Sequence, residues 1–112
     1  WEYIEALVEN DDLMLLDLGH MDLVSNFAMP IVCRGEVEEC KGRFIENGVE
    51  IRPVIAGNIG RQPFYQKYLD ERGEELGEYP NSDFVHENGF YLPNNPEMTE
   101  EEVGVICNLI RG

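Results

Sequence analysis

Short apolar segments alternate with amphipathic helical segments along this chain of 112 residues. Strands are expected at residues 13–18, 27–33, 49–54 and 90–92, and helices at 1–9, 36–47, 63–72 and 82–88. A last helix should begin after Thr99, because Thr99 and Glu102 form a T-x-x-E capping box ahead of a helical apolar pattern. The alternation predicts one domain, residues 1–112, with an α/β (α+β) two-layer sandwich in which helices pack on a small sheet.

The apolar positions within these segments predict the core. Residues 27–33 (FAMPIVC) are continuously apolar, which predicts a strand buried on both faces, and Pro30 places that strand at a sheet edge or a bulge. The helices should turn inward the following side chains: Ile4, Leu7 and Val8 in the first, Val37, Cys40, Phe44 and Ile45 in the second, and Val103, Ile106, Cys107 and Ile110 in the last.

The acidic balance limits the partners of this chain. It carries 23 Asp and Glu against 8 Lys and Arg, a net charge of −15. Such a chain repels phosphate backbones and anionic lipid surfaces, so we expect neither nucleic-acid nor membrane binding. No apolar run approaches the roughly 20 residues that span a bilayer, and no secretion signal is visible, so a cytoplasmic location is expected. The start at Trp1, inside a predicted helix, suggests a piece of a longer protein.

Most polar side chains that could carry chemistry have a simpler interpretation. Asp17, His20 and Asp22 lie within six positions but match no metal-site spacing, so we interpret them as an ordinary polar loop and predict no metal site. His86 lacks a nucleophile or carboxylate at a diagnostic spacing and is interpreted as a surface or half-buried histidine. The three cysteines, Cys33, Cys40 and Cys107, form no C-x-x-C pair and are expected to be reduced structural thiols.

One segment places two of the few cations around a glycine-bearing loop. Arg52 ends a predicted strand, and Asn58, Arg61 and Gln62 follow before a helix that Pro63 should open. In so acidic a chain, Arg52 and Arg61 could receive a phosphate or a carboxylate. The residues leave an equal alternative open, in which Arg52 pairs with a nearby glutamate and the loop only connects two elements.

The same segment carries a resemblance to a known family. GVEIRPVIAGNIGRQPFY (48–65) and the tail NSDFVHENGFYLPNNPEMTEEEVGVICNLI (81–110) resemble the C-terminal small domain of the DegT/DnrJ/EryC1/StrS family, the fold-type I sugar aminotransferases that depend on pyridoxal phosphate. The resemblance covers essentially the whole chain. The pattern RP…AGN…RQP looks more like the branch of nucleotide-sugar 3-dehydrases, which use pyridoxamine phosphate to remove the C-3 hydroxyl of a 4-keto-6-deoxyhexose for lipopolysaccharide O-antigens.

The resemblance implies a division of labour. The cofactor-binding large domain would be absent, neither Lys41 nor Lys67 looks like a Schiff-base lysine, and the fragment alone would be inactive, with no catalytic residue and no bound cofactor. Arg52, Asn58, Arg61 and Gln62 would face a nucleotide-linked sugar or a neighbouring subunit's site, and the full enzyme would be a homodimer. A sugar 4-aminotransferase of the same family, or a standalone acidic protein-interaction module, are the alternatives. A domain cut from its enzyme should also expose an apolar patch.

Overall fold

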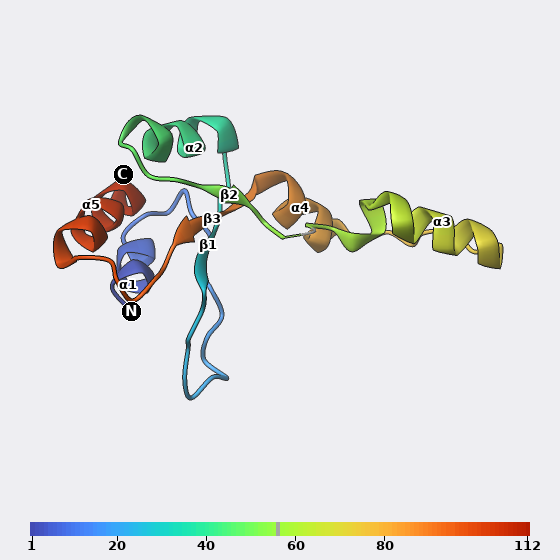
Figure 1. Cartoon of the computed structure of the whole chain (residues 1–112), viewed down its shortest axis with the longest axis horizontal. Coiled ribbons are helices and arrows are strands. Elements are labelled where there is room, and N and C mark those ends of the chain that lie inside the picture. Colours follow the sequence, from blue (N-terminus) through green and yellow to red (C-terminus); the bar gives the residue numbers. More distant parts are fainter. Residues whose placement is uncertain (56) are drawn as a thin grey trace.

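The chain folds into five α-helices, a short 3₁₀ helix and three strands over the residues that the computed structural model describes, 1–55 and 57–112 (Figure 1). In chain order these are α1 (Glu2–Val8), β1 (Ala28–Val32), α2 (Val37–Glu46), β2 (Arg52–Pro53), η1 (Ile59–Arg61), α3 (Pro63–Arg72), α4 (Pro80–Asn88), β3 (Gly89–Pro93) and α5 (Glu100–Arg111). The predicted α+β architecture, with helices on a small sheet, is confirmed.

The sheet is antiparallel, with the strand order β1-β3-β2. Strand β1 is therefore an edge strand, which confirms the position inferred from Pro30. The register pairs Ile31 with Phe90 and Met29 with Leu92, and all four of these side chains are buried. Cross-strand partners lie on the same face of a sheet, so these residues define the face that is turned toward the core.

Helices α1, α2 and α5 cover this face. Phe44 of α2 packs edge-on against Phe90, with ring centroids 5.6 Å apart. The first and last helices are joined where the side-chain amide of Asn10 donates to the Ile110 carbonyl at 2.6 Å. In α5, Ile106, Cys107 and Ile110 are buried as predicted, Val103 packs against the core, and the Thr99–Glu102 capping box is formed.

Several expectations about the periphery were wrong. Residues 13–18 form no strand, and only Leu13 makes an isolated bridge, to Cys33. Beyond it Leu15 is 56% exposed while Leu16 packs against the core, and the segment makes no further strand pairing with the described residues. The strand at 27–33 is half-buried on its second face rather than buried on both, because helices cover only one side of an antiparallel sheet. Val8 and Ile45 also point to solvent rather than inward.

The predicted strand at 49–54 is shorter in the structure. Only Arg52 and Pro53 pair with β3, and Pro53 has no N–H with which to extend the ladder. Val49 and Ile51 instead pack at the rim of the core. The predicted helix at 82–88 begins earlier, at Pro80, a residue that suits the first turn of a helix.

Helix α3 extends away from this core as an arm (Figure 1), and the molecule measures 53 × 34 × 27 Å. The arm begins at Pro63 and ends at Gly73, whose φ of 65° gives the left-handed cap expected of glycine. Its aromatic side chains contact one another but remain open, with Phe64 64% and Tyr68 49% exposed. Large apolar side chains are therefore exposed along this arm. None of the helices in the described part of the chain has the length and hydropathy to cross a bilayer.

Candidate functional site

The face of the sheet opposite the helices carries Arg52. Its register partner is Tyr91, and Pro30 lies opposite Tyr91 on the other side, so the three side chains share this open face. An open groove of about 630 Å³ runs along it, and Phe27 and Tyr91 meet edge-on there at 5.7 Å between ring centroids. The result is a cationic side chain beside an exposed aromatic surface.

The Arg52 guanidinium has one described partner. Its Nη2 lies 2.6 Å from a carboxylate oxygen of Glu50, and both side chains are about three-quarters exposed. Ion pairs in such exposed positions contribute about 0–1 kcal/mol, because water solvates both partners well. The pairing with glutamate that the sequence allowed is thus confirmed, and it is weak enough for another anion to replace the glutamate.

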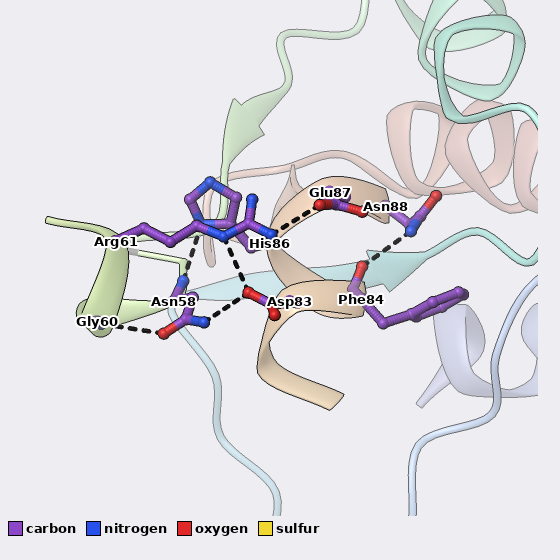
Figure 2. A network of polar contacts seen from close by, with 8 residues as sticks. All are labelled: Asn58, Gly60, Arg61, Asp83, Phe84, His86, Glu87 and Asn88. Carbon is purple, nitrogen blue, oxygen red and sulfur yellow. Dashed lines mark hydrogen bonds and ion pairs between the residues drawn. The ribbon is translucent and has the colours of Figure 1, made fainter. Parts of the chain in front are cut away.

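The loop of residues 57–62, of which all are described, is docked onto helix α4 (Figure 2). Three side chains of α4 receive it, Asp83, His86 and Glu87, which we call the α4 clamp. They stand at i, i+3 and i+4 and therefore on one face of the helix. The loop that the sequence singled out is thus fixed by tertiary contacts and is more than a connector.

Asn58 is the centre of this docking. It is only 6% exposed, and its backbone N–H donates to Nδ1 of His86 at 2.8 Å. Its side-chain amide donates to Asp83 at 2.7 Å, while its Oδ1 accepts from the Gly60 N–H at 3.0 Å. These contacts satisfy the buried polar atoms that would otherwise destabilise the loop. The side-chain acceptance from Gly60 also opens η1.

Arg61 also binds the α4 clamp, through the carboxylates of Asp83 and Glu87. Its Nε lies 2.9 Å from Asp83 and its Nη2 lies 2.7 Å from Glu87. Hydrogen bonding to Glu87, with the charge of Asp83, raises the pKa of the Arg61 guanidinium further above its usual value. Arg61 is therefore already neutralised by two carboxylates, in contrast to Arg52 with its single exposed partner.

The backbone of this loop needs glycine at Gly57. Gly57 has φ +50°, and a Cβ built there would lie 2.1 Å from Nδ1 of His86. At Gly60 a Cβ would meet only the end of the flexible Leu76 side chain, at 2.6 Å, which can move aside. His86 is half-buried as predicted, and its Nδ1 accepts the hydrogen bond from the Asn58 N–H beside Gly57.

Gln62 lies at the junction between η1 and α3. Its backbone N–H donates to Ile59, and its carbonyl accepts from Tyr65 and Gln66 at the start of α3. The structure thus brings Asn58 and Arg61 onto a shared carboxylate and places Gln62 just beyond them. Arg52 lies outside this set, on the groove that also reaches Val54 and Ile55 at the entrance to the loop.

The other polar candidates remain simple surface groups. His20 and Asp17 are 4.0 Å apart, with side chains 72% and 94% exposed. No group of three metal-ligating side chains occurs among the described residues. Asp17 accepts from the Gly19 N–H, which is an ordinary turn contact.

The two lysines do not fit a covalent cofactor site. A Schiff-base lysine is activated by desolvation or by a neighbouring cation. Nζ of Lys41 instead lies 2.9 Å from Glu38, and Lys67 is 79% exposed beside Glu71. Each lysine therefore lies beside a carboxylate, which is not the setting that activates a Schiff-base lysine.

The sequence analysis missed Asp83 and Glu87 as partners of the loop and treated His86 alone. Their spacing along one helix was a usable signal, because three titratable side chains at i, i+3 and i+4 form one polar stripe. The sequence could not show that this stripe meets a loop about 25 residues earlier, since only the tertiary fold brings them together.

Known proteins match this chain along most of its length. The protein-family model described as the DegT/DnrJ/EryC1/StrS aminotransferase family matches residues 2–111. The uncharacterized protein MJ1066 of Methanocaldococcus jannaschii is 31% identical over 75 residues, which are 67% of this chain. The same alignment covers 17% of that relative, so the chain corresponds to a small part of the longer protein it matches.

Proposed function

This chain belongs to the DegT/DnrJ/EryC1/StrS aminotransferase family, and on that premise we propose that it is the C-terminal small domain of a longer enzyme that acts on nucleotide-linked sugars. That enzyme would use pyridoxal or pyridoxamine phosphate, held by a large domain outside these 112 residues. The observation that carries the proposal is the family match over nearly the whole chain. The same match favours this function over a standalone acidic interaction module, for which only the net charge speaks.

Within that enzyme we assign substrate contact to the Arg52 groove. A nucleotide-linked sugar carries a diphosphate, and a guanidinium fork binds phosphate oxygens in a fixed orientation. The exposed pairing with Glu50 costs little to exchange, and the neighbouring Phe27 and Tyr91 offer an aromatic surface to a flat or apolar part of the ligand. Arg52 would orient the substrate and transfer no proton.

For Asn58, Arg61 and Gln62 we propose a role in the same substrate-facing region. The α4 clamp holds the loop through Asn58 and Arg61, so both side chains have their hydrogen-bonding groups committed in this arrangement. They would fix the shape of the wall beside the groove, while Arg52, whose one described partner is the exposed Glu50, provides the charge that meets the ligand. A preformed wall of this kind lowers the conformational cost of binding.

The reaction we favour is the 3-dehydration of a nucleotide-linked 4-keto-6-deoxyhexose, on the RP…AGN…RQP pattern. Its products would feed deoxysugars into lipopolysaccharide. A sugar 4-aminotransferase is the alternative within the same family. In either case the enzyme would work in the cytoplasm as a homodimer, and the exposed aromatic side chains of α3 would pack against the rest of the assembly.

Product analysis of the full-length enzyme tests this function. The enzyme, loaded with its cofactor, is given a nucleotide-linked 4-keto-6-deoxyhexose with and without an amino donor. Loss of the C-3 oxygen supports the dehydrase, and an amine at C-4 that requires the donor supports the aminotransferase. An unchanged sugar in both reactions contradicts the proposal.

The isolated 112-residue chain gives a second test. Mixed with pyridoxal phosphate, it should develop no Schiff-base absorbance band beyond that of a lysine-bearing peptide. A stoichiometric band would show that this chain holds the cofactor itself, and would contradict the division of labour proposed here.

A further inference from the structure

Two buried cysteines lie side by side where β1 meets α2. Cys33 follows the last residue of β1, and Cys40 lies in the first half of α2. Both are reduced and no more than 5% exposed. They line one open pocket of about 340 Å³ together with Arg43, and their sulfurs are close enough for each to alter the ionisation of the other.

The surroundings make the two thiols unequal. Hydrogen bonding from Cys33, assisted by the Arg43 guanidinium 3.8 Å from the sulfur, lowers the pKa of Cys40 to about 7. The same hydrogen bond and burial raise the pKa of Cys33. A pair of one thiolate and one thiol is what thiol–disulfide exchange requires, because the thiolate attacks first and the thiol resolves the intermediate.

We propose that Cys33 and Cys40 form a redox-active dithiol that a low-molecular-weight disulfide converts into an intramolecular disulfide. Acidic side chains line the same pocket, namely Asp12, Glu36 and Glu39, so a cationic disulfide should react faster than an anionic one. This site lies apart from the Arg52 groove, and the inference does not depend on the proposed function.

The exchange balances in two steps. The Cys40 thiolate attacks one sulfur of the reagent R–S–S–R, which breaks its S–S bond, forms a Cys40 mixed disulfide and releases one thiolate. Cys33 then gives up its proton and attacks the Cys40 sulfur, forming the Cys33–Cys40 bond and releasing the second R–S group. Two protein sulfurs are oxidised by two electrons in total, and the reagent is reduced to one thiol and one thiolate.

The bridge would fasten the start of α2 to the end of β1. It would enclose only residues 34–39, so its effect would be local rather than a large restriction of the unfolded chain. The N–H of Cys33 also donates to the carbonyl of Asn88, the last residue of α4. Oxidation would therefore act directly beside the helix that carries the α4 clamp.

The third cysteine is a built-in control. Burial raises the pKa of the Cys107 thiol, so it should stay protonated and react slowly. At neutral pH, a pKa near 7 gives Cys40 a thiolate fraction more than tenfold above that of an ordinary cysteine. We therefore expect Cys40 to react at least a few-fold faster than Cys107, after allowance for its lower intrinsic nucleophilicity.

Mass spectrometry of the folded protein treated with cystamine, a cationic disulfide, tests the proposal. The wild type should lose two hydrogens without retaining an adduct, and a digest should contain a peptide that links Cys33 to Cys40. The variant Cys33→Ser should stop at a stable mixed disulfide on Cys40, whereas Cys40→Ser should leave Cys33 unmodified over the same time. Glutathione disulfide, which is anionic, should act more slowly.

Two results would overturn the inference. One is a wild type that keeps all three thiols under conditions in which the denatured chain reacts fully. The other is a wild type that retains a mixed disulfide on Cys40 and forms no Cys33–Cys40 link. Both results are read on the wild-type protein, so they hold even if a serine variant fails to fold.

Discussion

Removal of the Asp83 carboxylate is the sharpest perturbation of the docked loop. This side chain accepts from the amide of Asn58 at 2.7 Å and from Nε of Arg61 at 2.9 Å. In Asp83→Ala the Asn58 amide, on a side chain only 6% exposed, loses its partner, which costs about 1–3 kcal/mol. The Arg61 pair is more than one-third exposed and adds at most about 1 kcal/mol.

We therefore expect Asp83→Ala to destabilise the docked loop by about 2 kcal/mol. That free energy corresponds to roughly 30-fold faster amide exchange in the loop of residues 57–62, if exchange occurs through local opening. The assay is hydrogen–deuterium exchange, read on peptides from this loop and, for comparison, on peptides from α5. Exchange in α5 should change much less.

A matched control is available on the same helix. Glu87→Ala removes the other carboxylate of Arg61 but leaves the Asn58 amide satisfied, and the Glu87 side chain is 59% exposed. Its effect should be at most a few-fold. Asp83→Asn keeps an acceptor oxygen for Asn58 and should fall between the two. If the loop amides exchange no faster in Asp83→Ala than in Glu87→Ala, the reasoning from buried polar groups is refuted.

Three further predictions concern the backbone and the core. Gly57→Ala should destabilise the protein by about 2 kcal/mol or more, because φ is +50° and the new Cβ would meet His86 at 2.1 Å. Gly42→Ala, in open space on a helix, should instead stabilise it by up to about 1 kcal/mol. Urea unfolding measures both changes. Burial raises the pKa of Tyr3 to about 12, so this tyrosine ionises first in the unfolded chain as the pH rises above 10, and stability falls. Tyr3→Phe should remove this part of the fall. Equal slopes of the unfolding free energy against pH for the two proteins would contradict the prediction. Thr99→Ala should cost about 1 kcal/mol through the lost capping box and Thr99→Ser much less, measured by thermal unfolding.

The sequence predicted best where one local rule determined the structure. The capping box at Thr99 and the glycine at the end of α3 gave helix ends that the structure confirms. The inward face of α5 followed from its periodicity, because that helix contacts the core along one continuous stripe.

Prediction failed where the identity of the neighbour decided the outcome. The segment 13–18 is as apolar as a strand, yet it pairs with no strand of the described chain beyond the bridge at Leu13, and periodicity alone cannot show this. Ile45 has the helical position of a core residue, but nothing in the described chain covers it. The second face of β1 is likewise only half-buried, because no helix packs against that face in the described chain.

The candidate site divides in the same way. The loop and its cations were visible in the sequence because arginine is scarce in so acidic a chain. The sequence did not show that Arg61 is paired with two carboxylates while Arg52 is paired with one. The partners of Arg61 lie on a helix 22 and 26 residues further along the chain. Arg52 stays available because its only described partner, Glu50, is as exposed as itself.

The central claim, that Arg52 receives an anionic part of a nucleotide-linked sugar, is tested most directly by substrate affinity in the full-length enzyme. The measurement is the dissociation constant of the nucleotide-linked sugar for the wild type, Arg52→Gln and Arg72→Gln. Arg72 is a matched control, since it is an exposed arginine on α3 paired with Glu74. Loss of a charged hydrogen bond should weaken binding by Arg52→Gln about tenfold or more, with Arg72→Gln near the wild type. Equal affinity for Arg52→Gln and the wild type would contradict the claim.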